Sequence, residues 1–457
     1  MTNNAAGMII AIPLFGPSDF AIPSTFDIRH SYCAMLDIRL IREKPDFVRE
    51  RLATRGGGDE MKIDEVLRVD GQRRKLETSL QQLNADRRRL SKEIGAKRTS
   101  GGTTAELEAR VREIGEAIVD LNKRTAAAEV EQEGLLLEIA NLPHESVPIG
   151  KDPSANRLVR SWGEKPPLTE PADHVALGAK LKLFDLERAA KLSGSGFICF
   201  TGAGAKLERA LINFMIDLHV REHGYREISP PFLVRRDCMI GTGQLPKFEP
   251  DMYGLENGEL FLAPTAEVPV TNFHREEILP IVDFPKKFVA YTPCFRREAG
   301  SAGRETRGII RVHQFDKVEL VKMTTAEKSY DELESLVAAA ERALQLLGLH
   351  YRILELCTGD LGFHAAKTYD IEVWSPGQNG YLEVSSCSNF EEFQARRMNL
   401  RYKGVDGKNH FCHTLNGSGV ALPRLFAALI ESCQQLDGSI RIPEKLQPYF
   451  VGTEIRL

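Results

Sequence analysis

Residues 295–319 read Phe-Arg-Arg-Glu-Ala-Gly-Ser-Ala-Gly-Arg-Glu-Thr-Arg-Gly-Ile-Ile-Arg-Val-His-Gln-Phe-Asp-Lys-Val-Glu, and this stretch decides the fold of the chain. Two segments that favour β-strands, 287–295 and 309–319, flank a polar loop that contains three glycines. This pattern predicts an antiparallel β-hairpin with a long tip.

The hairpin is rich in arginine. Arg296 closes the first predicted strand, and Arg311 opens the second. Arg304 and Arg307 lie in the loop between them. Guanidinium groups bind phosphate through paired hydrogen bonds, so this arrangement favours a polyphosphate ligand. The alternative is a solvated, charged loop tip, which is common on protein surfaces.

Length and composition narrow the class of protein. A chain of 457 residues predicts two or three structural units, and a net charge of −4 excludes a uniformly basic nucleic-acid coat. The 8 cysteines are scattered without C-x-x-C pairs or metal-binding spacing, which favours a reduced cytosolic enzyme without zinc. No segment approaches the ~20 apolar residues of a membrane span, so we expect no membrane anchor.

Residues 1–34 differ from the rest of the chain. They contain the short apolar run 8–15, but no Lys or Arg precedes it, so it does not fit a secretory signal. We interpret residues 1–34 as a disordered extension, or as sequence upstream of a true start at Met35, where a regular pattern begins.

Residues 61–141 have the periodicity of a coiled coil. Leu76, Leu83 and Leu90 recur every seven residues, and a second series of core positions runs from residue 107 to residue 142. Between them, residues 100–102 read Ser-Gly-Gly and predict a turn. We therefore expect an antiparallel helical hairpin, about 50 Å long at ~1.5 Å per residue.

The first of these two helices is basic and the second mainly acidic. The cations of the first helix include Arg87, Arg88, Arg89, Lys97 and Arg98. They either pair with the acidic partner helix or contact a phosphate backbone, where basic residues add affinity without reading sequence.

After a Pro-rich connection at 141–153, the pattern becomes that of an α+β domain. We expect helices at 203–224 and 326–347, another beginning near Pro423, and short strands that form an antiparallel sheet. An extended edge or interface strand is predicted at 225–231, because prolines are confined to such positions in a sheet. The glycine cluster at 194–204 is assigned to ordinary turns, since no Lys-Ser/Thr pair follows it.

Several polar residues lie near strand or loop ends. Thr265 and Glu267 supply acceptors for an ammonium group and a hydroxyl, whereas Glu383 with Ser385 and Ser386 offers oxygen ligands suited to Mg²⁺. A polar, glycine-rich turn is expected at 413–419, before the helix that carries Arg424. Each of these positions also has a structural interpretation, such as a helix cap, a surface ion pair or a buried hydroxyl.

Taken together, these segments resemble a known family. The signature segments are Phe295-Arg-x-Glu-Ala-Gly with its continuation to Glu319, Asn416-Gly-Ser-Gly followed by Arg424, and Gly224-Tyr with Pro230-Pro231. Glu383-Val-Ser-Ser-Cys-Ser-Asn, Gly241-Thr-Gly-Gln-Leu-Pro-Lys-Phe and Phe393-Gln-Ala-Arg-Arg are more specific. From Met35 onwards the chain resembles the bacterial-type seryl-tRNA synthetases, which are class II aminoacyl-tRNA synthetases.

The resemblance implies a set of site residues. ATP would be bound by Arg296, Arg297, Glu298, Val312, Phe315, Glu383, Val384, Ser385, Ser386 and Arg424. L-serine would be bound by Thr265, Ala266, Glu267, Glu319 and Ser418, and Mg²⁺ by Glu383 and Ser386.

Individual roles follow from the same resemblance. Arg296 would hold the α-phosphate, Arg424 the outer phosphates, and Phe315 would stack on the adenine whose amino group Glu298 contacts. Arg296, Arg424 and Glu383 would therefore be the catalytic residues. In-line attack of the serine carboxylate on the α-phosphorus depends on positioning and charge neutralisation, and it requires no covalent nucleophile.

The resemblance also implies a domain organisation and partners. Residues 35–141 would form an N-terminal tRNA-binding domain, with the helical hairpin as an arm that grips tRNA(Ser), and residues 142–457 the class II catalytic domain with its antiparallel sheet. Whether the chain also charges tRNA(Sec) is left open. A cytoplasmic homodimer is expected. Arg304 and Arg307 become candidates for contacting the tRNA acceptor end.

Two positions depart from the family pattern. Pro423 stands where glycine is expected, and its fixed φ affects the aim of Arg424 unless it occupies the first turn of a helix. Arg297 is bulkier than the small residue expected between Arg296 and Glu298.

Three alternatives belong to other functional classes. An enzyme that loads an amino acid onto a carrier protein should lack the helical arm. A class II synthetase for threonine or proline would not account for the segments at 383–389 and 393–397. A non-catalytic RNA-binding scaffold should have lost Arg296, Arg424 or Glu383, all of which are present.

Overall fold

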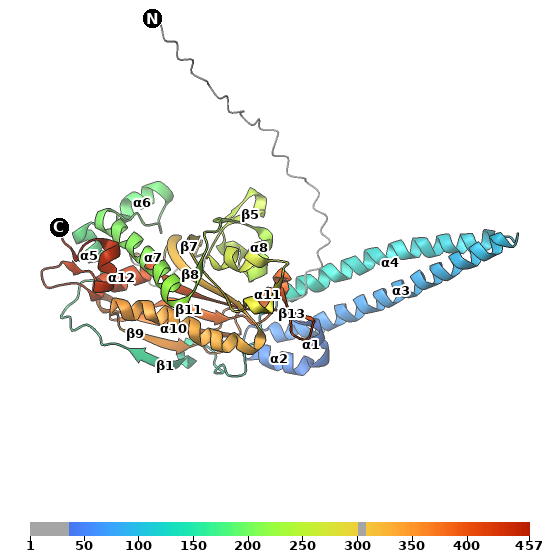
Figure 1. The fold of residues 1–457 in the computed structure, drawn as a ribbon, viewed down its shortest axis with the longest axis horizontal. Helices are drawn as coiled ribbons and strands as arrows, with labels where there is room; N and C mark the ends of the chain where they lie inside the picture. The colour runs from blue at the N-terminus through green and yellow to red at the C-terminus, as the bar shows by residue number, and fades with distance from the viewer. Residues whose placement is uncertain (1–35, 300–307) are drawn as a thin grey trace, which may run out of the picture. The chain divides into compact units, whose positions relative to one another are not determined.

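The computed structural model describes residues 36–299 and 308–457 (Figure 1). The helices are α1 (Ile38–Glu43), α2 (Pro45–Ala53), α3 (Ile63–Thr99), α4 (Ala105–Leu137), α5 (His174–Leu181), α6 (Leu186–Ser193), α7 (Gly202–His223), α8 (Arg236–Thr242), α9 (Glu267–Thr271), α10 (Ser329–Leu347), α11 (Phe393–Met398), α12 (Leu422–Ser432) and α13 (Gln447–Phe450). The strands are β1 (Arg157–Trp162), β2 (Arg226–Glu227), β3 (Leu233–Arg235), β4 (Gly254–Leu255), β5 (Leu260–Leu262), β6 (Ile278–Pro280), β7 (Lys286–Phe295), β8 (Gln314–Thr324), β9 (Tyr351–Glu355), β10 (Lys367–Ser375), β11 (Gly380–Asn389), β12 (Arg401–Lys403), β13 (Asn409–Phe411), β14 (His413–Ala421), β15 (Ile440–Arg441) and β16 (Glu454–Ile455).

The helical hairpin is formed by α3 and α4, of 37 and 33 residues. Leu76, Leu90 and Ile118 are buried along the seam, as the seven-residue repeat predicts. The chain reverses after Thr99, where Gly101 has φ +75°, a conformation that glycine adopts without strain. The predicted hairpin is therefore confirmed, and the two antiparallel helices lie side by side in Figure 1.

The predicted end of the second helix was wrong by about one turn, because α4 stops at Leu137 rather than at residue 142. The backbone that follows bonds to residues 363–366 instead of continuing the helix. The Asn141 N–H donates to the carbonyl of Phe363 at 2.9 Å, and the His144 N–H donates to that of Ala366 at 2.8 Å. These tertiary bonds replace the last intrahelical ones.

The part of the chain after the hairpin is built on an eight-stranded sheet in the order β1-β9-β10-β11-β14-β8-β7-β2. Neighbouring strands are antiparallel except β2 and β7, which are parallel. Helices α7, α10 and α12 share the largest buried cluster with β8, β10 and β14, through residues such as Leu211, Leu336, Phe426 and Leu320. The predicted α+β architecture is confirmed, and β2 lies at the sheet edge, as the prolines after it indicate.

Two local predictions were wrong. The strand expected at 309–319 begins only at Gln314, although the first strand of the hairpin, β7, lies where it was predicted. Residues 413–419 form the middle strand β14 and not a turn. Their polar backbone is satisfied by pairing with β11 and β8, and Gly417 is required by close packing, since a Cβ there would lie 2.7 Å from the Cys387 sulfur.

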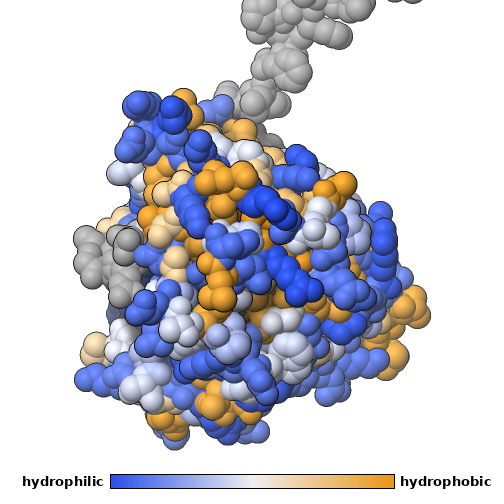
Figure 2. Space-filling model, turned by 90° about the vertical axis from the view of Figure 1, so that its left-hand side faces the viewer, coloured by the Kyte–Doolittle hydropathy of each residue, from blue (hydrophilic) through white to orange (hydrophobic). Residues whose placement is uncertain are grey.

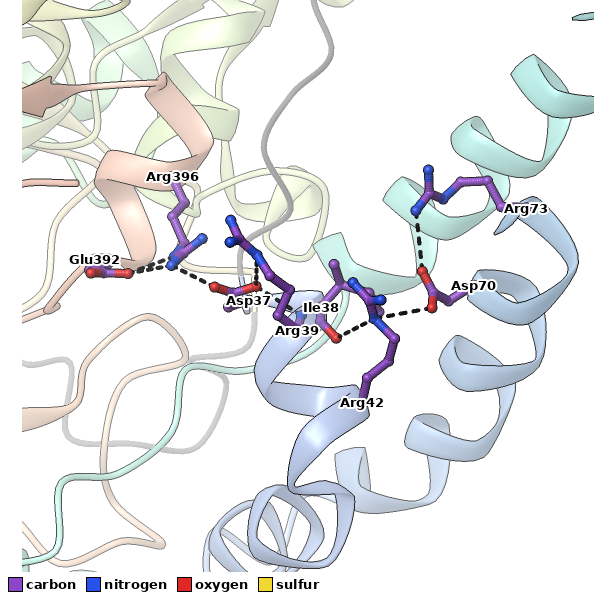
Figure 3. A network of polar contacts seen from close by, with 8 residues as sticks. All are labelled: Asp37, Ile38, Arg39, Arg42, Asp70, Arg73, Glu392 and Arg396. Carbon is purple, nitrogen blue, oxygen red and sulfur yellow. Dashed lines mark hydrogen bonds and ion pairs between the residues drawn. The ribbon is translucent and has the colours of Figure 1, made fainter. Parts of the chain in front are cut away.

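Polar contacts join the N-terminal helices to α11 (Figure 3). Arg396 on α11 pairs with Asp37, the N-cap of α1, at 3.1 Å and with Glu392 at 2.5 Å. Further along, Asp70 of α3 pairs with Arg42 at 3.3 Å and with Arg73 at 3.4 Å. Helix α11 therefore contacts both parts of the chain.

Arg55 is a second connection at the same junction. Its guanidinium donates to the carbonyl oxygens of Asn141, Leu361, Gly362 and Ala365. Burial lowers its pKa to about 10, so the group stays charged at neutral pH. One arginine thereby satisfies acceptors from two segments that are distant in sequence.

Replacing Arg55 by Met is expected to lower the free energy of unfolding by about 2 kcal/mol, because it leaves four carbonyls, three of them partly buried, without this donor. Urea unfolding followed by circular dichroism measures the change. Arg39→Met is the control, because the Arg39 side chain is 73% exposed, and it should cost no more than about 0.5 kcal/mol. Equal losses for the two variants would contradict this role of Arg55.

Candidate active site

Alternation along β8 defines the face of the sheet that holds the site. Val318 and Leu320 point into the helix-covered core, so Phe315, Lys317 and Glu319 lie on the opposite face. All the candidate strands are neighbours in the sheet order, namely β11, β14, β8 and β7. Residues far apart in sequence can therefore meet on this face.

Arg296 lies directly after β7, where its backbone exchanges hydrogen bonds with His313. Its Nε donates to the carbonyl of Pro264 at 3.2 Å, and its guanidinium carbon lies 5.2 Å from the centre of the Phe315 ring. Its two terminal nitrogens form no hydrogen bond or ion pair with a described residue, so they can bind an anion. Arg296 and Phe315 thus lie together, as a site for a phosphate and an aromatic base requires.

The remaining members of the predicted ATP set on the hairpin differ in accessibility. Glu298 accepts a hydrogen bond from Arg311 at 2.9 Å, and Val312 is buried. Arg297 is exposed, and its backbone N–H donates to the carbonyl of Asp251. Arg304 and Arg307 lie outside the described residues, as does the predicted extension at 1–34.

A β-bulge in β11 arranges the predicted metal ligands. Glu372 of β10 pairs with Glu383, but the next pairs are Ile371 with Ser385 and Asp370 with Ser386. Residues directly opposite each other share a face, so the extra residue, Val384, brings Glu383 and Ser386 onto the same side. Without the bulge their three-residue spacing would place them on opposite faces.

Arg424 lies beside this strand. It sits in the first turns of α12, after Pro423, which occupies the start of the helix as its geometry allows. Its guanidinium donates to the carbonyl of Glu383 at 2.9 Å and to that of Ile310 at 3.3 Å, and it lies 3.3 Å from the Glu383 carboxylate. Arg424 and Glu383 are therefore adjacent.

The donor set fits a magnesium ion that arrives with phosphates. Glu383 and Ser386 supply oxygens, and the Asp370 carboxylate, opposite Ser386, has one buried oxygen without a hydrogen-bond partner. Burial, and next the charge of Glu383, raise the pKa of Asp370 well above its usual value. No group of three or more His, Cys, Asp or Glu side chains placed to hold a metal occurs among the described residues, and Mg²⁺ needs no such cage when phosphates and water complete its shell.

The predicted serine-binding residues also lie together. Ser418 on β14 is directly opposite Glu319 on β8, and the Thr265 hydroxyl donates to the Glu319 carboxylate at 3.0 Å. Lys317 forms an ion pair with the same carboxylate. The two carboxylates of this pocket therefore differ, because Glu319 is neutralised by a neighbouring cation whereas Glu267 is not.

Glu267 begins α9 and is 4% exposed. Burial, and next the charge of Glu319, raise its pKa to about 7, against the opposing effect of hydrogen bonds from Gln394 and Asn416. Of the other predicted residues, Ala266, Val384 and Ser385 are buried. The Ser385 hydroxyl donates to the carbonyl of Ser418 at 2.6 Å and so connects β11 to β14.

Three residues near the site were missed by sequence analysis: Lys317, Asp370 and Gln394. Lys317 had a signal, since it alternates with Phe315 and Glu319 in the same strand. Gln394 lies in the family-specific segment Phe393-Gln-Ala-Arg-Arg, but its contact with Glu267 was not predicted because it depends on the position of α11. Asp370 gave no signal, because its role depends on the pairing of β10 with β11.

Basic residues of the arm are only partly neutralised. Arg68 pairs with Glu131 and Arg98 with Glu108 across the two helices. Within α3, Arg89 pairs with Asp86. The further cations Arg87, Arg88 and Lys92 are exposed and form no ion pair with any described residue. Pairing with the acidic helix therefore accounts for part of the basic stripe only.

Comparison with known proteins identifies the family. Residues 35–143 match the seryl-tRNA synthetase N-terminal domain, and residues 248–433 match the tRNA synthetase class II core domain (G, H, P, S and T). The chain is 58% identical over 422 residues to the serine–tRNA ligase of Akkermansia muciniphila, covering 92% of this chain and 99% of that protein. This chain belongs to the seryl-tRNA synthetase family.

Other relatives agree with this assignment. The serine–tRNA ligase of Syntrophomonas wolfei is 53% identical over 92% of this chain and 98% of its own length. Among solved structures, seryl-tRNA synthetase from Pyrococcus horikoshii complexed with ATP superposes with a TM-score of 0.87 at 38% identity, covering 92% of this chain and 99% of that one. The resemblance inferred from the sequence motifs is thereby confirmed.

None of the helices in the described part of the chain is long and apolar enough to cross a membrane.

Proposed function

We propose that the face formed by β7, β8, β11 and β14 is the site at which this chain joins ATP and L-serine to form seryl-adenylate. As a member of the seryl-tRNA synthetase family, the chain is a serine–tRNA ligase, which charges tRNA with serine. The observation that supports the assignment of the site is that Phe315, which Arg296 contacts, lies on the same face of β8 as Glu319 of the acidic pocket. Arg424 pairs with Glu383 on β11, the strand that the Ser385–Ser418 hydrogen bond joins to this pocket.

Within this proposal the arginines act on the phosphates. Arg296 neutralises the α-phosphate as the serine carboxylate attacks it, and Arg424 holds the outer phosphates that leave as pyrophosphate. Mg²⁺, held by Glu383 and Ser386, would supply charge neutralisation between phosphate oxygens. Glu298 and Phe315 contact the adenine. Serine is bound by Thr265, Ala266, Glu267, Glu319 and Ser418.

The arm, α3 and α4, binds tRNA(Ser) through exposed cations, above all Arg87, Arg88 and Lys92, which form no ion pair with any described residue. Double-stranded RNA is contacted mainly by shape and backbone, so exposed basic side chains along a helix are the appropriate chemistry. Arg304 and Arg307 remain candidates for contacting the acceptor end. A cytoplasmic location is part of the same proposal.

The proposal includes a homodimer formed through the segment 224–231. Strand β2 ends the eight-stranded sheet, and the residues after it, Phe232 and Leu233, are exposed apolar side chains. The face in Figure 2 carries apolar residues among hydrophilic ones. We place the pairing of two copies at the sheet edge at β2, where exposed apolar side chains adjoin an unpaired strand edge.

ATP–pyrophosphate exchange with each of the twenty amino acids tests the activity. Exchange is expected in the presence of serine. Alanine should support it poorly, because alanine has no hydroxyl to donate to the buried acceptors of the pocket. Exchange that depends on another amino acid, or none with serine, would contradict the proposed activation reaction.

The pH dependence tests the pocket. Because the pKa of Glu267 is about 7, kcat/KM for serine should fall about tenfold per pH unit below pH 7, as the carboxylate takes up a proton and stops accepting from serine. At saturating serine, kcat/KM for ATP should not fall below pH 7, since bound serine keeps Glu267 ionised. A serine profile that is flat between about pH 6 and 8 would argue against Glu267 as a serine ligand.

A further inference from the structure

Glu267 is held by a residue that lies outside the serine-binding set. Gln394, on helix α11, is fully buried and donates from Nε2 to the Glu267 carboxylate at 2.6 Å. This is a short contact for an amide N–H with an oxygen, typical of bonds to a charged acceptor. It joins two segments that are separated by 127 residues in the sequence.

The orientation of the Gln394 amide is fixed by its other neighbours. Its Nε2 also donates to the backbone carbonyl of Thr242 at 3.2 Å, and a carbonyl can only accept. Its Oε1 accepts from the Thr414 hydroxyl at 2.8 Å. The group that faces Glu267 is therefore an N–H donor, and the carboxylate oxygen it meets must accept.

Helix α11 itself is anchored from the other side. Arg397, which is 1% exposed, donates to the carbonyls of Ile240, Leu245 and Leu137. Arg396 holds Asp37 and Glu392, as Figure 3 shows. Because the helix is fixed to three segments, Gln394 sets the position of Glu267 rather than following it.

We propose that Gln394 is a positioning residue for serine binding, which holds the Glu267 carboxylate as an oriented, ionised acceptor for a polar group of the substrate. This inference rests on the serine pocket proposed above. Gln394 and Asn416 both donate to the Glu267 carboxylate, and its remaining lone pairs are left for serine. The Thr414 hydroxyl, by donating to the Gln394 Oε1, keeps the amide from turning its oxygen towards the Glu267 carboxylate.

The experiment measures serine and ATP kinetics in pyrophosphate exchange for Gln394→Met and Thr414→Val. Gln394→Met keeps the length of the side chain and removes the donor, so the KM for serine should rise about 30-fold with the KM for ATP within about twofold. Thr414→Val should raise the serine KM about fivefold, because it frees the amide to rotate without deleting it. Arg396→Gln is the matched control on the same helix, and it should lower thermal stability while leaving the serine KM unchanged.

Pairwise coupling separates positioning from general damage. In a Glu267→Gln background, Gln394→Met should have almost no further effect on the serine KM, since the carboxylate it orients is gone. Additive effects of the two substitutions, or a folded Gln394→Met enzyme whose serine and ATP KM values change equally, would overturn the proposal.

The failure of the pocket itself would look different. If Glu267→Gln alone leaves the serine KM unchanged, the assignment of the serine pocket fails. If Glu267→Gln raises the serine KM and Gln394→Met does not, the pocket stands and only the positioning role of Gln394 is refuted.

Discussion

Substitution of Arg296 by alanine is expected to lower kcat/KM for serine-dependent ATP–pyrophosphate exchange by about 100- to 1,000-fold. The side chain is fixed by its bond to Pro264 and by the Phe315 ring, so it reaches the ligand already oriented. Such a preorganised cation stabilises the charge that develops on the α-phosphate during attack, and a truncated side chain leaves that charge to water.

Arg296→Lys is the informative companion variant. It keeps the charge but loses the fork that bonds Pro264 and a phosphate together, so we expect a loss of about 10- to 100-fold. Thermal unfolding should show both variants to be folded. Exchange within about threefold of the parent enzyme for Arg296→Ala would contradict the assignment of Arg296 to the α-phosphate.

Shortening the arm is expected to lower kcat/KM for tRNA(Ser) in aminoacylation by about 1,000-fold or more. The rate of pyrophosphate exchange should stay within about threefold of that of the full-length enzyme. The structure indicates where to cut. Replacing residues 79–123 with the turn sequence Ser-Gly-Gly keeps the buried bond between Gln132 and Asp70 at 3.0 Å and the Arg68–Glu131 pair, which join the two helices at their base. Aminoacylation and exchange are measured on the same preparation.

A charge-reversal variant of the full-length arm separates electrostatics from loss of the helices. Arg87→Glu combined with Arg88→Glu removes two cations that form no ion pair with described residues. The affinity for tRNA should therefore weaken, and the slope of log affinity against log salt concentration should become shallower by about 2. Charging that survives the shortened arm at full efficiency would refute the role of α3 and α4 in binding tRNA.

Local patterns in the sequence predicted much of the fold. The seven-residue repeat specified the helical hairpin and the Ser-Gly-Gly segment its turn, because helix periodicity and glycine conformation act over a few residues. The prolines after β2 likewise indicated a sheet edge. The predicted turn at 413–419 was wrong because glycines that serve close packing cannot be distinguished by sequence from glycines that serve a turn.

For the site, the sequence by itself determined which chemical groups are available: the arginines for phosphate, and the carboxylates and hydroxyls for metal and substrate. The tertiary structure decided how they meet. The bulge at Val384 brings Glu383 and Ser386 onto one face, and the packing of α11 places Gln394 against Glu267. Strand register and helix packing depend on partners that are distant along the chain, so short-range patterns in the sequence do not encode them.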